Sequence, residues 1–195
     1  MSTLVVGISG KKRSGKDTLC SSLVSVLEGV QCHSRRRALA DALKEEAASS
    51  LAPQFAAAGI SEKQLLAMLY SDEQKEQFRL YLQWHGTEFR RAFFGDDYLT
   101  RQMDEYIAAW EFAADIPRKV LFVPDVRFPN EVEWVHSHNG LLIHVERPGL
   151  PSDTHSSETA LDGFSGYNYR VVNDGDINSL AVQAQNIGLA LAARL

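Results

Sequence analysis

Short apolar segments alternate along the chain with stretches that carry apolar residues at helical spacing. The first of these segments, residues 3–9, is rich in β-branched residues, as in strands buried on both faces of a parallel sheet. The apolar segments predict the following strands: residues 3–9, 30–33, 120–124, 141–145 and 169–172. Helical spacing predicts helices from about residue 15, over residues 38–51, from about residue 129 and from about residue 177. This alternation predicts a three-layer α/β fold around a mostly parallel central sheet.

The middle of the chain, residues 61–112, has helical patterning and no segment that predicts a strand. Aromatic and charged residues are dense there. No internal repeat or interdomain linker interrupts the sequence. We therefore expect one domain over residues 1–195, with a helical insertion at about residues 61–112.

Composition narrows the class of protein. The 195 residues carry a net charge of −5, and 45% of them are hydrophobic, as in an ordinary globular protein. An acidic chain is a poor binder of nucleic acid polymers through its overall field. No apolar run reaches the ~20 residues that cross a bilayer, so no membrane contact is expected. Cys20 and Cys32 offer no disulfide framework, and the start lacks the layout of a signal peptide, which favours a cytoplasmic location.

Residues 10–16, GKKRSGK, fit the pattern G-x-x-x-x-G-K of a phosphate-binding loop, or P-loop. The pattern follows the first predicted strand and opens the first predicted helix, which is the context that the motif requires. Glycines let backbone N–H groups turn toward phosphate oxygens, the lysine reaches the β- and γ-phosphates, and the helix N-terminus adds positive charge. A glycine turn in an unrelated α/β protein is the alternative. The context favours the phosphate-binding loop.

Two positions of this loop are unusual. The residue after Lys16, normally a Ser or Thr that binds Mg²⁺, is Asp17. Either Asp17 holds the water shell of the metal or Thr18 helps to shape the phosphate site, and the sequence leaves both open. Arg13 places a guanidinium beside the phosphates, which suits transfer between two phosphate groups. An exposed loop charge is the alternative for Arg13.

A second group of polar residues follows the strand predicted at residues 120–124. Asp125 and Arg127 stand at its carboxyl end, where ligands of open α/β sheets bind. A carboxylate there binds Mg²⁺ or takes the acceptor's proton, and an arginine binds phosphate through two N–H groups. A capping Asp beside a surface Arg is the alternative. The phosphate-binding loop favours the functional interpretation.

Several segments occur in an order that resembles the deoxynucleoside monophosphate kinases of tailed bacteriophages: SGKKRSGKDT, LQWHGTE, VPDVRFPNE, HVERPG, DTHSSE and VVNDG. The likeness extends from residue 9 to about residue 175, and residues 30–78 match poorly. The loop with Asp17 also looks like animal-type phosphomevalonate kinase, which is the second choice. The resemblance implies a P-loop kinase fold in which the helical insertion binds the acceptor and acts as a lid.

The resemblance also implies roles for individual residues. ATP is expected to contact Gly10, Ser14, Gly15, Lys16, Asp17, Thr18, Arg147 and Asn173. The acceptor is expected to contact Lys12, Lys44, Arg79, Trp84, Gly86, Thr87, Glu88, Arg91, Arg127, His155 and Glu158. The catalytic residues would be Lys16, Arg13, Asp125 and Arg127, with Mg²⁺ bound by Asp17 and Asp125. The family tends to have a tryptophan where this chain has Leu99.

Two features of the insertion have more than one interpretation. The Trp84 ring either stacks on the acceptor base or belongs to a core. Arg90 and Arg91 either close on a phosphate or form exposed ion pairs.

The function expected from these residues is transfer of the γ-phosphoryl group of ATP to a deoxynucleoside monophosphate, giving a deoxynucleoside diphosphate and ADP, with Mg²⁺ as cofactor. A small-molecule kinase similar to phosphomevalonate kinase is one alternative, and a P-loop ATPase or switch protein is another. The partners expected are the two small-molecule substrates, with no nucleic acid polymer and no membrane. A homodimer is left open.

Overall fold

The computed structural model of the protein describes residues 3–71, 73–113, 117–151 and 155–195. Its contacts divide the chain into two compact units. The sheet unit comprises Met1–Ala38 and Asp104–Leu195, and the helical unit comprises Leu39–Met103. The single domain with an insertion at residues 61–112 stays a prediction. No helix within the described ranges is long and apolar enough to cross a membrane.

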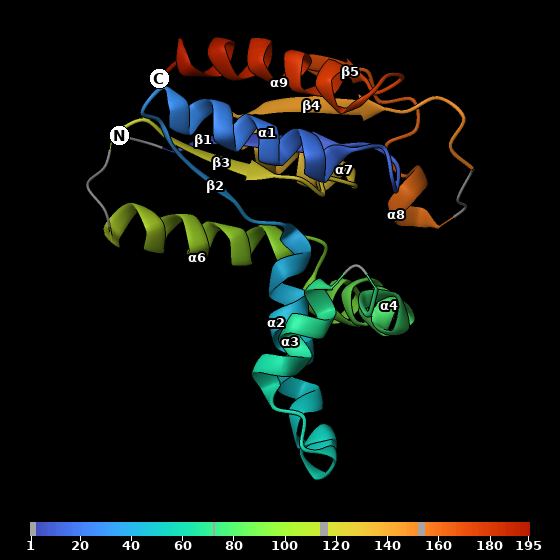
Figure 1. Cartoon of the computed structure of the whole chain (residues 1–195). Helices are drawn as coiled ribbons and strands as arrows, with labels where there is room; N and C mark the ends of the chain where they lie inside the picture. Colours follow the sequence, from blue (N-terminus) through green and yellow to red (C-terminus); the bar gives the residue numbers. More distant parts are fainter. Residues whose placement is uncertain (1–2, 72, 114–116, 152–154) are drawn as a thin grey trace. The chain divides into compact units, whose positions relative to one another are not determined.

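The described part of the sheet unit is built on a parallel five-stranded sheet (Figure 1). Its strands are β1 (Leu4–Ser9), β2 (His33–Arg36), β3 (Lys119–Val123), β4 (Leu141–Glu146) and β5 (Tyr169–Val172). Their order is β2-β3-β1-β4-β5, and every adjacent pair is parallel. The central strand β1 has β3 on one side and β4 on the other, so the strand order reverses direction there. Ligands of open α/β sheets bind at such a point.

The prediction of a strand at residues 30–33 is wrong, because β2 begins only at His33. Residues 30–32 turn the chain at the end of α1 (Lys16–Gly29), where the N–H groups of Val30 and Cys32 both donate to the Leu27 carbonyl. Gln31 has a φ of 58°, which is typical of a turn. Val30 and Cys32 pack against the core from within this turn, so their apolar character does not mark a strand. The other predicted strands are confirmed to within one residue.

Helices cover both faces of the sheet. α1 and α9 (Ile177–Ala192) lie on one face (Figure 1), where they share a buried core with Val6 and Ile8 of β1. On the other face, a side chain at Gly7 of β1 would press against Val135 of α7 (Pro129–Ser137). Successive residues of β1 thus face different helices, as a strand buried on both sides requires. The three-layer α/β class is confirmed.

The described residues of the helical unit form helices and no strand. Its elements are α2 (Leu39–Phe55), η1 (Ala56–Ala58), α3 (Glu62–Tyr70), η2 (Lys75–Phe78), α4 (Arg79–Gln83), η3 (Trp84–Arg91), α5 (Ala92–Phe94) and the start of α6 (Tyr98–Ala113). α2 continues beyond the predicted end at residue 51 and includes Pro53. η3 is a π-helix, a rare form that is frequent at functional sites.

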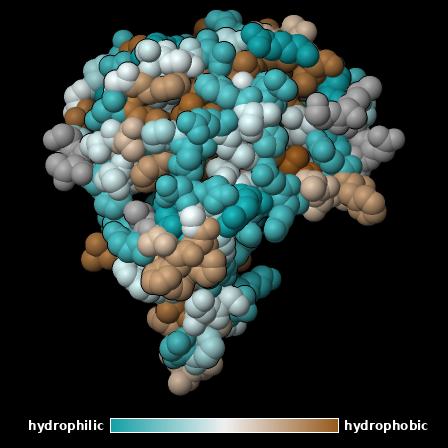
Figure 2. All heavy atoms as spheres, turned by 180° about the vertical axis from the view of Figure 1, so that it is seen from behind, coloured by the Kyte–Doolittle hydropathy of each residue, from teal (hydrophilic) through white to brown (hydrophobic). Residues whose placement is uncertain are grey.

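The helical unit also exposes large apolar side chains. Leu80, Trp84 and Phe93 are 81%, 51% and 74% exposed. Trp84 is therefore no part of the buried core, although its ring stacks on Phe89. On the face of the molecule shown in Figure 2, hydrophobic and hydrophilic residues are interspersed.

Candidate active site

The loop of residues 10–15 joins β1 to α1 at the carboxyl end of the central strand. Gly10 and Gly15 have φ values of 145° and 100°, which L side chains rarely adopt. A Cβ at Gly10 would collide with the backbone oxygen of Val145, and a Cβ at Gly15 would lie 2.5 Å from Nδ2 of Asn173. Both motif glycines are thus required by backbone shape and by close neighbours. Gly15 caps α1 without a side-chain hydrogen bond, which leaves the helix N-terminus available to an anion.

Replacing Gly10 by alanine is expected to lower the free energy of unfolding by at least roughly 1–3 kcal/mol, because the strained φ adds to the collision with Val145. Urea unfolding followed by circular dichroism measures the change. Gly29→Ala is the matched control, because a Cβ at Gly29 meets no atom within 4 Å. Equal stability of the Gly10→Ala variant and the wild type would contradict this account of the loop.

Lys16 is the first residue of α1 and is buried. Its Nζ donates to the carbonyl oxygens of Gly10 and Lys11, at 2.7 Å each. Burial, reinforced by the positive charge of Arg127, lowers the pKa of Lys16 to about 8. The ammonium is thus held in the curve of the loop, where a phosphate group would offer it a better-matched counter-ion.

Ser14 gives a second sign that the loop fits phosphate. Its Oγ is buried and has no hydrogen-bond partner within the described part of the chain. A buried hydroxyl without a partner is costly, and a phosphate oxygen would satisfy it. The Ser14 carbonyl is already satisfied, because it accepts a hydrogen bond from Nδ2 of Asn173 at 2.8 Å. Asn173 therefore holds the backbone of the loop through its side-chain amide. The sequence predicted Asn173 only as an ATP contact.

If the loop binds a nucleotide, the lowered pKa of Lys16 is expected to make that binding dependent on pH. Above about pH 8 the ligand-free loop loses its ammonium, so the affinity for ADP is expected to fall between pH 7 and pH 9. Bound ADP raises the pKa again, so binding at pH 8 should take up a proton. Calorimetry in two buffers of different ionisation enthalpy measures this uptake, and its absence would show that the Lys16 pKa is not lowered.

Without ligand, the contribution of Lys16 to the free energy of unfolding rises with pH from about pH 8 toward pH 10.5. In this range Lys16 is protonated in the unfolded chain but not in the folded protein.

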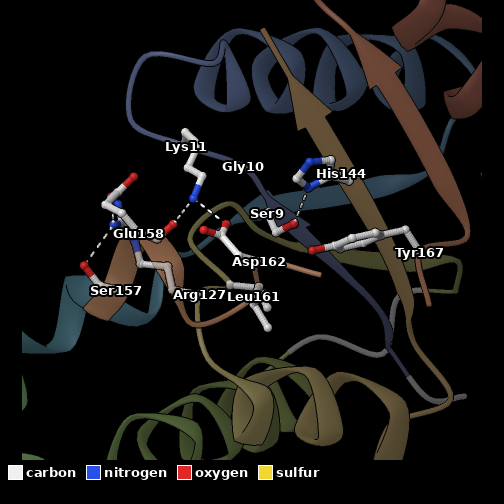
Figure 3. A pocket seen from close by; sticks show the side chains of 11 residues that line it. Ser9, Gly10, Lys11, Arg127, His144, Ser157, Glu158, Leu161, Asp162 and Tyr167 are labelled. Carbon is white, nitrogen blue, oxygen red and sulfur yellow. Dashed lines mark hydrogen bonds and ion pairs between the residues drawn. The ribbon is translucent and has the colours of Figure 1, made fainter. Parts of the chain in front are cut away.

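A second cluster lies beside the loop, where α8 (Ser156–Thr159) meets the segment after β3 (Figure 3). The Glu158 carboxylate accepts the backbone N–H of Lys12 at 2.8 Å and forms an ion pair with Nη1 of Arg127. Lys11 bonds through Nζ to the Glu158 carbonyl and to Oδ1 of Asp162. The structure thus brings together Lys12, Arg127 and Glu158, which are far apart in the sequence.

Lys11, Arg127, Glu158 and Asp162 line a pocket of about 310 Å³, a volume that includes the part open to solvent. His144 of β4 shares a hydrogen bond of 3.0 Å with Oγ of Ser9 and stacks on Tyr167. Burial, followed by the charge of Arg170, lowers the pKa of His144, so its ring is neutral at pH 7. The Tyr167 hydroxyl is buried, has no hydrogen-bond partner among the described residues, and points toward the middle of the pocket (Figure 3).

The predicted metal ligands are less clearly placed. Asp17 is exposed, and its Oδ1 forms an ion pair with Nη2 of Arg36 at 3.0 Å. Asp125 is half-buried in the turn that follows β3. No group of three or more acidic, histidine or cysteine residues that could hold a metal occurs in the described ranges. Asp17 and Asp125 as Mg²⁺ ligands stay a prediction.

Other predicted contacts of the sheet unit lie at its surface. Arg13, Thr18 and Arg147 are exposed, and Arg13 has a φ of 64°. The Nδ1 atom of His155 accepts the backbone N–H of Ser157 at 3.2 Å and so caps α8. The described contacts of His155 are therefore structural, and its role toward the acceptor stays a prediction.

The remaining predicted acceptor contacts belong to the helical unit. Lys44 pairs with Asp41, Arg79 pairs with Glu76, and Arg91 donates to the carbonyl of Asp96, at 3.1 Å each. Gly86 packs against Leu43, which a Cβ would approach to 2.7 Å, and Glu88 is exposed. The side chain of Thr87 lies outside the described part. Leu99 is buried.

The sequence interpretation missed Glu46, which organises part of the helical unit. Its carboxylate accepts from Nε of Arg90 at 2.7 Å and from the Tyr98 hydroxyl, and it lies 3.1 Å from Nε2 of His85. Arg90 thus forms a mostly buried ion pair, so the alternative of an exposed ion pair is wrong for Arg90. Nothing in the spacing of Glu46 and Arg90 indicates this contact. Lys11 was also missed, although it stands within the loop motif.

The chain resembles a viral protein in sequence and aligns with a solved kinase structure over most of its length. A proposed deoxynucleotide monophosphate kinase of Acanthamoeba polyphaga mimivirus is 28% identical over 200 residues, which cover 92% of this chain and 93% of the relative. The crystal structure of an unliganded sugar kinase from Janibacter sp. HTCC2649 aligns with 98% of this chain and 95% of its own, at 14% identity and a TM-score of 0.45.

The profile of the deoxynucleotide monophosphate kinase family matches residues 54–184, well over half of the chain. This match begins after the phosphate-binding loop, so the loop and the family likeness are separate observations. It includes Arg127 and Glu158, the two side chains that meet beside the loop. The chain belongs to the deoxynucleotide monophosphate kinase family and is a phosphotransferase.

Proposed function

We propose that the protein transfers the γ-phosphoryl group of ATP to a deoxynucleoside monophosphate, giving a deoxynucleoside diphosphate and ADP. One observation carries this proposal. The loop of residues 10–15 leads directly into the buried Lys16 and lies beside the Arg127 guanidinium. The loop suits the triphosphate of ATP, and Arg127 suits the phosphate of the acceptor. The family to which the chain belongs supports a deoxynucleoside monophosphate as the acceptor.

The proposed reaction needs little covalent chemistry from the protein. An oxygen of the acceptor phosphate attacks the γ-phosphorus, the bond from this phosphorus to the β–γ bridging oxygen breaks, and ADP leaves. A phosphate monoester has its second pKa near ~6, so the attacking oxygen is already ionised at pH 7 and requires no general base. The residues of the chain position the two substrates and neutralise charge.

Each residue has a defined part in this scheme. Lys16 binds the β- and γ-phosphates, and the hydroxyl of Ser14 donates to a phosphate oxygen. Arg127 orients the acceptor phosphate, with Arg13 as a second cation at the loop surface. Mg²⁺ neutralises phosphate charge when bound, and it commonly uses one or two carboxylates together with substrate phosphates and water. Asp17 and Asp125 are the residues proposed to contact it.

The test is ADP production from ATP and Mg²⁺ with dAMP, dGMP, dCMP, dTMP, 5-hydroxymethyl-dCMP or phosphomevalonate offered separately. Turnover that depends on a deoxynucleotide, with the diphosphate identified by phosphorus NMR, is the expected result. Turnover with phosphomevalonate alone would replace the acceptor. ATP hydrolysis that is indifferent to every acceptor would reject the proposal in favour of an ATPase.

The biological setting is part of the same proposal. The viral source of the mimivirus relative supports a role in the nucleotide supply of a virus, and the resemblance to tailed-phage enzymes suggests a phage acting in the host cytoplasm. Turnover of 5-hydroxymethyl-dCMP would strengthen this setting, because this acceptor carries a modified base.

A further inference from the structure

Glu158 fills the space beside the phosphate-binding loop with a carboxylate. Its side chain is only 4% exposed. One oxygen accepts the Lys12 backbone N–H at 2.8 Å, and the other pairs with the Arg127 guanidinium. Together with the Glu158 carbonyl, Asp162 of the same segment holds the Lys11 ammonium (Figure 3). Two acidic residues of one segment thus bind a loop amide, a guanidinium and an ammonium.

These donors are the groups with which proteins bind phosphate. Backbone N–H groups of a glycine-rich loop, a guanidinium and an ammonium all favour an oxyanion with several acceptor oxygens. A carboxylate offers two such oxygens, and a phosphate group offers three. In the ligand-free protein the Glu158 carboxylate therefore binds the donors that a phosphate group would bind in a complex, namely the Lys12 N–H and the Arg127 guanidinium.

The contacts around Glu158 can be reached from solvent. Arg127, Lys11 and Asp162 are 33%, 41% and 58% exposed in their side chains. All of them line the pocket together with Glu158. A phosphate group can thus approach Arg127 and Lys11 from the pocket without unfolding of the segment.

We infer that Glu158 occupies a phosphate subsite in the ligand-free protein, and that a substrate phosphate displaces it from Arg127 and the Lys12 N–H while Lys11 passes from Asp162 to the ligand. The inference rests on the proposed function in one respect, namely that the phosphate belongs to a substrate of phosphoryl transfer. The acceptor phosphate and the γ-phosphate of ATP share this chemistry. The Glu158 carboxylate competes with the substrate phosphate for the same donors. The apparent affinity for the substrate is therefore lower than it would be without this carboxylate.

Glu158→Gln tests the inference, because it keeps the shape and an acceptor for the Lys12 N–H but removes the charge. The variant is expected to bind dGMP about tenfold more tightly than the wild type in titration calorimetry. This factor is typical of the coupling between two groups that compete for a site, here the Glu158 carboxylate and the phosphate. Tightening with the ATP analogue AMP-PNP in place of dGMP would assign the subsite to the γ-phosphate. Glu133→Gln, at an exposed position of α7, is the matched control and should bind both as the wild type does.

Unchanged or weaker binding of both nucleotides by a folded Glu158→Gln protein would overturn the inference, since Glu158 would then hold Arg127 in place for the substrate. Asp162→Asn, at a more exposed position, gives a second variant if Glu158→Gln does not fold, and it should tighten binding by a smaller factor. Inorganic pyrophosphate serves as a probe that is independent of the reaction. Tighter pyrophosphate binding by Glu158→Gln in a protein that turns over no deoxynucleotide would support the subsite and reject the proposed function.

Discussion

Lys16→Met is expected to lower kcat/KM for phosphoryl transfer by about 10³-fold, close to the loss seen when one preorganised charge-stabilising donor is removed. Lys16 supplies a buried ammonium in the curve of the loop, and the proposed reaction develops charge on the transferred group there. Methionine has a similar length and no charge. The lowered pKa of Lys16 shows that burying its charge destabilises the ligand-free protein. Lys16→Met removes this unfavourable charge, which offsets part of the stability lost with the two hydrogen bonds of Nζ.

The measurement combines steady-state kinetics with thermal unfolding. The Lys16→Met variant should unfold at a temperature close to that of the wild type while its turnover is nearly absent. Lys63→Met, at an exposed position of α3, is the matched control and should retain full activity. Near-normal turnover by a folded Lys16→Met protein would reject the assignment of residues 10–16 as the nucleotide-binding loop.

Arg127→Met is expected to affect the acceptor far more than ATP. We expect kcat/KM for the deoxynucleotide to fall by about 10²–10³-fold, since one charge-stabilising donor is lost. The KM for ATP should change little, because the loop and Lys16 remain. Stability should also fall, since the buried Glu158 loses its ion pair, although the partial exposure of Arg127 limits the effect.

Initial rates at varied acceptor and fixed ATP separate these effects. Arg101→Met is the matched control, because Arg101 is 53% exposed and pairs with Asp97. If Arg127→Met raised the KM for ATP and left the acceptor kinetics unchanged, Arg127 would belong to the ATP site. If the variant retained all kinetic constants, its contact with Glu158 would be purely structural.

Much of the sheet unit could be predicted from the sequence because its strands are buried on both faces. β1, β3 and β4 appear as apolar runs of the length that a buried parallel strand needs. β2 gives a weaker signal, because its sequence HSRR is mostly exposed and polar. Edge strands of this kind depend on a neighbour, here β3, and hydrophobicity along the chain does not reveal them.

The site was predictable where a motif fixes the local backbone. Gly10, Gly15 and Lys16 follow from the spacing of the loop, whose geometry demands those residue types. Contacts across the sheet have no such signature: the pairing of Glu158 with Arg127 joins residues 31 positions apart, and that of Lys12 with Glu158 joins residues 146 positions apart. The sequence indicates that these three residues are polar and lie close to motifs, but it does not indicate which of them contact one another.

The central place of β1 has a consequence for how the chain folds. β1 is made first but pairs only with β3 and β4, so Leu4 meets Val120 and Val6 meets Leu141. Closing such long loops is slow, because entropy is lost before the strands gain their contacts. The helical unit, Leu39–Met103, is continuous in sequence and is made before both neighbours of β1. During synthesis the apolar segment LVVGIS is thus made before the strands that cover it, and it is open to aggregation until they arrive.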